Sequence, residues 1–412
     1  MFVISVTLFA ALLLLAIGQS IYVFLFSNRI ARPDDPLLDD EDCPVAAVVL
    51  CVRGKDPHLE KCLTSICDLD YPEYQLHIVL DNEQDPAMPL AQQFCNNNPL
   101  GQVHVLDDRR STCSLKCSSL LYASKQIGDT VSFVAQLDSD TIPNRHWLRA
   151  LATGLNDPKV GVISGIRWYV PPDEGWGSLV RYIWNAAAIV QMVLYGIAWG
   201  GTLAIRKSVF EQTDLQERWG KALCEDTMLS TVLRATEFKT EFRSDLFVVN
   251  RESSSLKDVI SWISRQLLTA RLYHPCWWLV FIHAMSTSIA VLSAVAMLLT
   301  SLCQFNFWPA IWLAAGIVLY QVSNAIMLEK IGQTVNRSKT DLESAKPELS
   351  VRFLLAAPLT QACYFIAAIA AIFTRTIRWR NIEYEIRGPW NITMKNYEPF
   401  SDSANANELE SL

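Results

Sequence analysis

Charge is scarce in this 412-residue sequence, and its scarcity excludes several classes of protein. Charged residues make up 19% of the chain and apolar residues 51%, which excludes a disordered chain and is too apolar for an ordinary soluble protein of this size. The 35 basic and 42 acidic residues give a net charge of −7, and no basic stripe stands out. A nucleic-acid partner is therefore not expected.

The 11 cysteines lack the spacing of a disulfide framework or of a zinc ribbon. Cys62 and Cys67 lie five residues apart and Cys113 and Cys117 four apart, and neither pair has a matching His or Cys pair. The 6 histidines are isolated as well. An odd number of unframed cysteines is typical of reduced thiols that face the cytosol, so a metal–thiolate site is not expected.

Residues 1–28 contain no charge and are long enough to span a bilayer. The run has no basic segment before it and is longer than a typical signal-peptide core, so we interpret it as a retained N-terminal membrane anchor. Arg29 and Arg32 follow directly, which places the downstream chain in the cytosol by the positive-inside tendency. An acidic linker, 29–44, then leads to the next domain.

A C-terminal membrane region is expected over 276–374. Residues 276–328 carry no charge, and the polar turn Gln304-Phe305-Asn306 predicts that they form a hairpin of two helices. Residues 353–374 form another uncharged run, in which Pro358 favours a re-entrant or interfacial segment.

Basic clusters follow the hairpin and the last apolar run, and each favours the cytosolic side of the membrane. They comprise Lys330, Arg337, Lys339, Lys346 and Arg352, and then Arg375, Arg378, Arg380 and Arg387. If every apolar run crossed the membrane, the tail 375–412 would end on the side away from the cytosol, although its arginines favour the cytosolic side. The number of crossings stays open, with two to three C-terminal membrane segments expected.

One more uncharged stretch, 182–205, is long enough to suggest a transmembrane helix. It contains Asn185, Gln191 and the pair Gly200-Gly201, and a helix followed by a buried strand fits it equally well. The acidic motifs before and after this stretch have to lie on the same side of the membrane if they act at one site. We therefore interpret it as a buried or membrane-surface element.

The segment 45–257 alternates short apolar runs with helical patterns, which predicts an α/β domain with a doubly wound, mostly parallel sheet. Strands are expected at 45–52, 76–80, 103–106 and 131–137, and helices at 57–67 and 116–126. Ligands of such sheets bind beyond the carboxyl ends of the strands. Asp81 and Asp138 each follow an expected strand, which makes that edge the candidate site.

Two acidic motifs suggest chemistry at this edge. Asp138 and Asp140 can share one Mg²⁺ or Mn²⁺, which would offset the charge that develops on a diphosphate leaving group. Acidic turns are common, so the place of this motif after a buried strand is what favours a metal site. Glu225 and Asp226 open an expected helix, TMLSTVLRA. There the carboxylates either stabilise the helix by interacting with its dipole, or one of them acts as a general base that takes a proton from an acceptor hydroxyl.

Several motifs follow one another in a specific order. They are VVLCVRGKDPHLEKCLTSICDLDYPEYQLHIVLDNEQDP, SLKCSSLLYA, AQLDSDTIP, WGGTLAIRKSVF, CEDTMLS, SRQLLTARLY and the late TIRWRNIEYEIRG. This order resembles the membrane-bound family-2 glycosyltransferases, specifically the ceramide-glucosyltransferase-like branch, over about residues 45–275. The resemblance implies a GT-A fold, a nucleotide-sugar donor and inversion at the anomeric carbon.

The resemblance also implies a role for each matching residue. On the donor side, Asp81 would contact the base or ribose, with Asp85 as a companion, and Lys116 would lie near the diphosphate. Asp138 and Asp140 would form the metal-binding D-x-D. On the acceptor side, Gly200 and Gly201 would shape the end of the pocket, and Asp226 would be the catalytic base with Glu225 beside it.

One motif departs from the family pattern, on the interfacial helix expected over 258–275. The family shows Gln, two residues and then Arg-Trp, whereas here Gln266 is followed by Thr269 and Ala270. Arg265 and Arg271 are the expected substitutes for the missing cation, in a diphosphate or acceptor role. Contact with phospholipid headgroups is the alternative for both.

The tryptophan of that motif is absent here, but Trp262 lies one helical turn upstream of Gln266. Seven more aromatic residues are expected on helices over 168–199, either as a cover that keeps water from the donor or as core and membrane-interface packing. They are Trp168, Tyr169, Trp176, Tyr182, Trp184, Tyr195 and Trp199.

The sequence therefore predicts an integral membrane protein whose catalytic domain faces the cytosol. We expect a metal-dependent, inverting hexosyltransferase that moves a sugar from a nucleotide-diphosphate donor, with UDP-hexose preferred, to a membrane lipid hydroxyl such as that of a ceramide. A processive polysaccharide synthase is the second interpretation. A catalytically inactive membrane scaffold of the same fold is the third.

Overall fold

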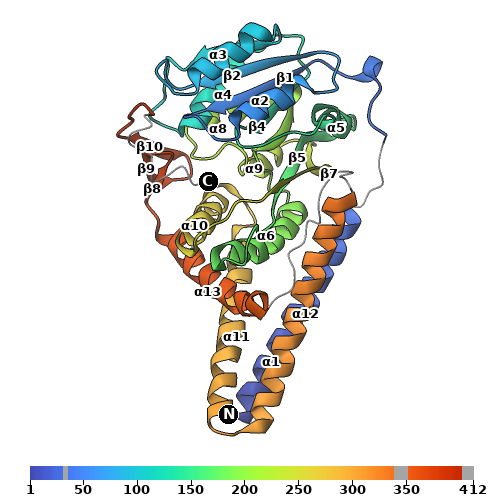
Figure 1. The fold of residues 1–412 in the computed structure, drawn as a ribbon, viewed down its shortest axis with the longest axis vertical. Coiled ribbons are helices and arrows are strands. Elements are labelled where there is room, and N and C mark those ends of the chain that lie inside the picture. The colour runs from blue at the N-terminus through green and yellow to red at the C-terminus, as the bar shows by residue number, and fades with distance from the viewer. Residues whose placement is uncertain (31–35, 338–350, 401–412) are drawn as a thin grey trace.

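The computed structural model of the protein describes residues 1–30, 36–337 and 351–400. An α/β domain lies at one end of the molecule and a bundle of long helices extends from it (Figure 1). Parts of the linker, of the basic loop and of the tail fall outside the described residues, and so do Arg32, Lys339 and Lys346.

A seven-stranded sheet forms the centre of the domain, in the order β3-β2-β1-β4-β6-β5-β7. Its strands are β1 (Ala46–Val52), β2 (Tyr74–Leu80), β3 (Gly101–Val105), β4 (Phe133–Asp138), β5 (Val160–Tyr169), β6 (Thr202–Arg206) and β7 (Lys239–Asn250). Strands β3, β2, β1 and β4 pair in parallel, as do β5 and β7, whereas β6 runs antiparallel between β4 and β5. The predicted mostly parallel sheet is confirmed.

Helices cover both faces of this sheet, because successive strand residues point to opposite sides. Val48 and Leu50 of β1 pack with one group of helices and Val49 with another. The first group is α2 (Leu59–Cys67), α3 (Met88–Asn97) and α5 (Trp147–Gly154), and the second is α4 (Leu115–Gln126), α7 (Lys207–Gln212), α8 (Leu215–Trp219) and α9 (Leu229–Leu233).

Strand β5 corrects one expectation from the sequence. Trp168 and Tyr169 lie at its end, so the prediction that they belong to a helix is wrong. All ten residues of β5 are buried, because both faces of the strand are covered. A strand covered on both faces loses the alternation of apolar and polar residues that identifies a strand in a sequence.

The stretch 182–205 forms a helix and then a buried strand, as predicted. Helix α6 (Trp176–Tyr195) ends at Gly196, whose positive φ of 76° suits a glycine that terminates a helix. Asn185 is buried in α6 and satisfies the backbone of β5 by accepting from Tyr169 N and donating to Arg167 O. Buried polar contacts of this kind explain why the apolar run carries an asparagine.

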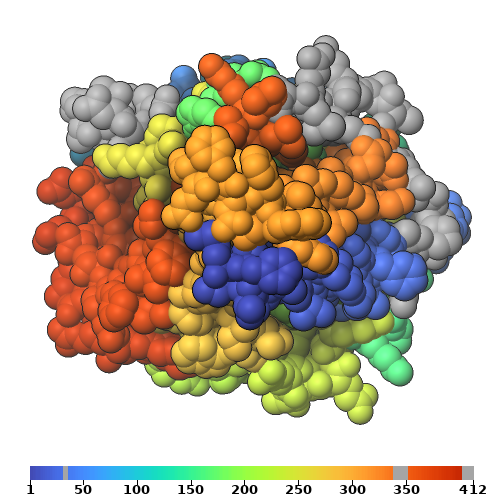
Figure 2. All heavy atoms as spheres, turned by 90° about the horizontal axis from the view of Figure 1, so that it is seen from below, coloured from blue at the N-terminus to red at the C-terminus, as the bar shows by residue number. Residues whose placement is uncertain are grey.

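The long helices α1 (Phe2–Ile30), α11 (Trp277–Cys303) and α12 (Phe307–Arg337) pack side by side beyond the domain (Figure 1). The predicted hairpin of α11 and α12 is confirmed, and Asn306 in its turn contacts Met1 at the far end of the bundle. Figure 2 shows this end, with the start of α1 between the two helices. Their outer surface is apolar, with Leu14, Trp278 and Trp308 among its exposed side chains.

Two further helices lie at the base of the domain. Helix α10 (Leu256–Tyr273) and helix α13 (Val351–Phe373) pack on each other and on α6, and Figure 1 shows α13 at an angle to the bundle. Pro358 lies inside α13. Within the described part of the chain, five helices are long and apolar enough to cross a membrane, namely α1, α6, α11, α12 and α13.

A second sheet follows α13, where the sequence analysis assigned no element. It is antiparallel, in the order β10-β9-β8, and consists of β8 (Thr376–Trp379), β9 (Ile382–Gly388) and β10 (Asn391–Lys395). Ile382, Tyr384 and Ile386 are buried in the same core as α4, α8 and α9. This C-terminal sheet therefore packs as part of the α/β domain.

Replacing Ile382 by Ala tests this packing. Ile382 is fully buried, so the substitution should lower the free energy of unfolding by about 2–5 kcal/mol. The change should appear as a lower melting temperature of the detergent-solubilised protein. Thr376→Ala on the exposed start of β8 is the control. An unchanged melting temperature for Ile382→Ala would show that the second sheet is not part of the domain core.

Candidate functional site

The sheet brings the predicted acidic residues to one edge. Strands β1, β2 and β4 are parallel and end there, whereas the antiparallel β6 begins there, with Thr202 opposite Leu137. Asp138 is therefore the last residue of β4, and it lies next to Gly200 and Gly201 at the entrance of β6. This register explains why a glycine pair far along the chain meets the D-x-D motif.

Lys116 joins two of the acidic motifs. It lies in the first turn of α4, and its ammonium group is 2.7 Å from Asp138 Oδ1 and 2.6 Å from Glu225 Oε1. Burial alone would lower the pKa of Lys116, but the two carboxylates outweigh it and raise the pKa well above its ordinary value. Lys116 thus stays charged and holds the end of β4 against the loop that carries Glu225.

Arg167 of β5 holds the second aspartate of the D-x-D. Its guanidinium donates to both oxygens of Asp140, at 2.8 and 2.7 Å, and lies 3.6 Å from Asp138 Oδ2. Burial alone would raise the pKa of Asp140, but Arg167 and, more weakly, Arg380 lower it below its usual range. Asp140 is therefore ionised, and its position is fixed by a bidentate contact.

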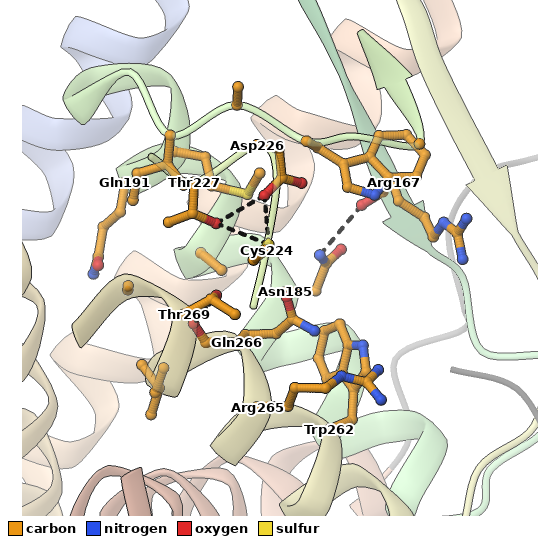
Figure 3. Close-up of a pocket in the computed structure, with 18 of the residues that line it drawn as sticks. Arg167, Asn185, Gln191, Cys224, Asp226, Thr227, Trp262, Arg265, Gln266 and Thr269 are labelled. Carbon is orange, nitrogen blue, oxygen red and sulfur yellow. Dashed lines mark hydrogen bonds between the residues drawn. The ribbon is translucent and has the colours of Figure 1, made fainter. Parts of the chain in front are cut away.

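Asp226 is held by three donors. Gly200 N donates to its Oδ2 at 2.6 Å. Cys224 Sγ and Thr227 Oγ1 donate to its Oδ1, both at 2.9 Å, and Figure 3 shows these two contacts. The expected helix over 227–235 shortens to α9, so Glu225 and Asp226 lie in the loop before it rather than at its first turn. The loop, rather than a helix dipole, positions the pair.

The two glycines allow this close approach. A Cβ atom at Gly200 would lie 2.2 Å from Glu225 Oε1, and one at Gly201 would lie 2.6 Å from Asp138 Oδ2. Any side chain there would push the acidic groups apart. Gly200 and Gly201 thus set the spacing of the carboxylates, in addition to the predicted role of shaping the pocket.

Negative charge exceeds positive charge in this network, which contains the carboxylates of Asp138, Asp140, Glu225 and Asp226 and the cations of Lys116 and Arg167. Burial raises the pKa of Glu225 to about 7, with Lys116 opposing the shift and Asp226 adding to it. Glu225 Oε2 is buried and has no hydrogen-bond partner among the described residues. A protonated Glu225 lowers the excess of negative charge.

A pocket extends from these groups into a gap between helices, and it encloses about 210 Å³. Asp138, Glu225 and Asp226 line one end, and Figure 3 shows Trp262, Arg265 and Gln266 of α10 across from Asp226. The remainder is mostly apolar and is lined by side chains of α6, α10, α11 and α13, among them Trp184, Ala188, Met192, Leu267, Val280 and Tyr364. The pocket is therefore polar at the sheet edge and apolar toward the membrane helices.

Arg265 and Arg271 differ in their surroundings, although both lie on α10. Arg265 lines the pocket, has no ion-pair partner in the described part of the chain and lies over the Trp379 ring at 5.6 Å. Arg271 donates to the backbone oxygens of Ile372 and Thr374 at the end of α13. The structure brings Arg265 and Gln266 to the site and leaves Arg271 outside it.

Asp81 and Asp85 follow the end of β2, and neither of them lines the pocket. Asp81 pairs with Arg53 and accepts a hydrogen bond of 3.0 Å from the Tyr397 hydroxyl. Asp85 accepts from the backbone N–H groups of Gly54 and Ala87, both at 2.8 Å, and so fixes the loops beyond β1 and β2. The Asp81 carboxylate is bound by side chains, whereas Asp85 supports the backbone around it.

Arg167 and Arg53 were not predicted from the sequence, and Trp199 was predicted only as one of the aromatic residues on a helix. Arg167 lies in the buried run VGVISGIRWY, and a single arginine in such a run signals a buried anionic partner. Trp199, expected on a helix, lies in the loop before β6, where it covers the Arg167 guanidinium at 4.8 Å. Neither contact could be read from spacing, because β5 itself was not predicted.

The residues at the D-x-D fit a divalent cation that takes only part of its ligand shell from protein. Asp138 is 26% exposed and faces the pocket, whereas Asp140 is 3% exposed and is bound by Arg167. Among the described residues, no group of three or more His, Cys, Asp or Glu side chains could hold a metal. Mg²⁺ binds through one or two carboxylates when substrate phosphates complete its shell.

The pH dependence of stability tests the protonation of Glu225. The folded protein binds a proton with a pKa of about 7, against an ordinary value of 4.5, so the free energy of unfolding should fall as pH rises from 4.5 to 7. Glu225→Gln should remove this fall. The measurement is denaturant unfolding of both proteins across that window, with the exposed Glu217→Gln as control. A pH-independent difference between Glu225→Gln and wild type would contradict the account.

Comparison with known proteins identifies a family of glycosyltransferases. The sequence profile described as Glycosyl transferase family 21 matches residues 8–391, a range that includes α1 and the C-terminal sheet. Two ceramide glucosyltransferases match shorter segments: that of Komagataella phaffii is 28% identical over 81 residues, and that of Pyricularia oryzae is 35% identical over 70 residues. These segments cover 20% and 16% of this chain but only 15% and 14% of the two relatives.

A solved structure shows the same fold. The mannosyltransferase from Pyrobaculum calidifontis, in complex with GDP-Man and Mn²⁺, aligns with 90% of this chain and 99% of its own, with a TM-score of 0.52 and 16% identity. The fold is therefore GT-A-like, as the motif order implied, and the resemblance to ceramide glucosyltransferases holds. The profile match over most of the chain shows that this protein belongs to glycosyltransferase family 21.

Proposed function

We propose that this glycosyltransferase moves one sugar from a nucleoside-diphosphate donor, with UDP-hexose preferred, to the hydroxyl of a membrane lipid of the ceramide type. The pocket that is acidic at the sheet edge and apolar between α6, α10, α11 and α13 carries this proposal. A lipid acceptor presents a hydroxyl next to an acyl chain, and such a pocket accommodates both parts. A soluble sugar would leave the apolar half unused.

Asp226 is the general base in this proposal. Its carboxylate lines the pocket and is oriented by Gly200, Cys224 and Thr227, so it accepts a proton from an acceptor hydroxyl that arrives from the apolar side. The deprotonated oxygen attacks the anomeric carbon from the face opposite the diphosphate, which inverts the configuration. Glu225 precedes it in the same loop, and the Gly200 N–H helps to keep this carboxylate in place.

The donor lies along the edge of the sheet in this proposal. Asp81 exchanges its contacts with Arg53 and Tyr397 for the base or ribose, while Asp85 supports its loop. Lys116 and Arg265 contact the diphosphate. Arg265 is available for this contact because it lines the pocket and has no ion-pair partner among the described residues. Mg²⁺ or Mn²⁺ held by Asp138 and Asp140 would supply further positive charge for the leaving diphosphate.

Three crossings of the membrane fit the packing of the C-terminal sheet. That sheet shares a core with the catalytic domain, so the chain after α10 has to return to the same side. The hairpin of α11 and α12 crosses the membrane twice and returns the chain to the side of the α/β domain. Helix α13 then lies along the membrane surface instead of crossing it. The exposed apolar side chains of α13, among them Leu354, Leu355 and Ile366, then face lipid. Basic residues on both sides of α13 favour the cytosolic side for the domain.

Asp226→Asn tests the proposed reaction. With the protein in ceramide-containing vesicles, UDP-glucose and Mn²⁺, wild type should add a single hexose mass to the lipid, and the variant should lose about 100-fold or more of this activity, because the amide cannot accept the proton. The product is measured by mass spectrometry. Asp129→Asn, at an exposed carboxylate, should match wild type.

Other outcomes identify the competing functions. A long glycan in place of a modified lipid would support a processive synthase, and an absence of turnover in wild type would support an inactive scaffold. Equal activity of Asp226→Asn and wild type would remove Asp226 as the base.

Native cysteines test the orientation. Cys67 is exposed on the catalytic domain and Cys303 is exposed at the far end of α11. In vesicles whose cytosolic face points outward, a membrane-impermeant maleimide should label Cys67 directly and Cys303 only after detergent is added. Cys67→Ser and Cys303→Ser assign the two signals. Direct labelling of Cys303 in sealed vesicles would contradict the three-crossing arrangement.

A further inference from the structure

The turn between β8 and β9 lies at the acidic edge of the catalytic domain. Trp379, the last residue of β8, lines the catalytic pocket together with Asp226 and Arg265. Trp379 and Arg380 also line an adjoining hollow, whose other walls include Lys116, Asp138 and Asp140. A segment more than 200 residues from the D-x-D motif in the sequence therefore borders both cavities.

The backbone of this turn is unusual for the residues that it carries. Arg380 and Asn381 have positive φ values of 47° and 61°, the conformation of a two-residue hairpin turn. Asparagine adopts this region readily, but for arginine it is strained, and strain of this kind concentrates at functional sites. A glycine would form the same turn without strain, so the arginine is not required by the fold.

The turn also presents polar groups that have no close partner in the part of the chain that the structure describes. The Trp379 Nε1–H is buried and has no hydrogen-bond partner among the described residues. Over the same residues, the Arg380 guanidinium makes only long contacts, 3.7 Å to Asp56 Oδ2 and 3.4 Å to Arg53 O. In contrast, the backbone of the turn is anchored, because Arg53 Nε donates to Arg380 O at 3.1 Å.

The hollow has the features of an anion site. The start of α4 faces it with the N-cap residue Ser114 and with Lys116, and the positive end of a helix dipole favours a phosphate there. Lys116 is already shared by Asp138 and Glu225, so it cannot alone balance a diphosphate. Arg380 is the cation on the opposite wall whose side chain is not committed to a close ion pair.

We propose that the β8–β9 turn is a wall of the donor site, in which the Arg380 guanidinium binds the diphosphate of the nucleotide sugar and the Trp379 indole N–H donates to an oxygen of the same donor. The proposal rests on the proposed transferase function and adds two donor contacts from the C-terminal sheet. Arg380 also faces the acidic D-x-D across the hollow, where it lowers the repulsion between the carboxylates and an incoming diphosphate.

Arg380→Gly separates this role from a structural one. Glycine adopts positive φ without strain, so the melting temperature of the variant should equal or exceed that of wild type. Loss of a charge-assisted contact should raise the dissociation constants of UDP and UDP-glucose roughly tenfold to a hundredfold. Binding of uridine, which lacks the diphosphate, should be unchanged, and Arg380→Lys should restore part of the affinity.

Two further variants complete the experiment. Trp379→Phe keeps the ring and removes the unpartnered N–H, so it should weaken UDP-glucose binding about two- to tenfold without loss of thermal stability. Arg378→Ala, on the exposed side of the same strand, is the control and should bind like wild type.

The outcomes distinguish the two proposals. If wild type binds and uses UDP-glucose but Arg380→Gly has the same affinity for UDP, the turn is not part of the donor site. Equal losses for UDP and uridine, or a lower melting temperature, would assign Arg380 a structural role and overturn the proposal. If wild type neither binds nor uses any nucleotide sugar, the proposed transferase function itself fails.

Discussion

The candidate site at the sheet edge depends on a buried network in which Lys116 and Arg167 hold acidic groups that come from separate parts of the chain. Breaking a buried ion pair typically costs about 3–5 kcal/mol, because the remaining charge stays desolvated. The two cations thus fix the relative positions of β4, β5 and the loop before α9. They do so at the point where the donor is expected to bind, and the glycine pair allows the groups to meet.

The membrane helices and the C-terminal sheet complete this edge from opposite sides. Helices α6, α10, α11 and α13 surround the apolar half of the pocket, and β8 adds Trp379 to its polar half. Helix α10 lacks the Arg-Trp pair of the family pattern, as the sequence already showed. In the structure an aromatic residue and an arginine reach the same region from the β8–β9 turn, while Arg265 lies over the Trp379 ring.

Much of the sheet and of its acidic residues was predictable, because short apolar runs ending in aspartate identify parallel strands and their ligand edge. Asp81 and Asp138 were found in this way, whereas Asp226 was found from its place before an expected helix and from the family resemblance. The structure brings Asp138 and Asp226 into one pocket. Strand β5 was missed because burial on both faces removes alternation, and Arg167 was missed with it. The role of the late segment around Trp379 depends on packing over more than 200 residues of sequence, which no local pattern reports.

The central claim is that one pocket joins the acidic edge to the gap between the membrane helices. Photocrosslinking with a ceramide analogue that carries a diazirine in its acyl chain, followed by peptide mapping, tests it most directly. The account predicts adducts on the pocket-facing residues of α6, α11 and α13, such as Trp184, Val280 and Tyr364, and competition by unlabelled ceramide. Adducts confined to the outer surface of the α1, α11 and α12 bundle, with no competition, would contradict it.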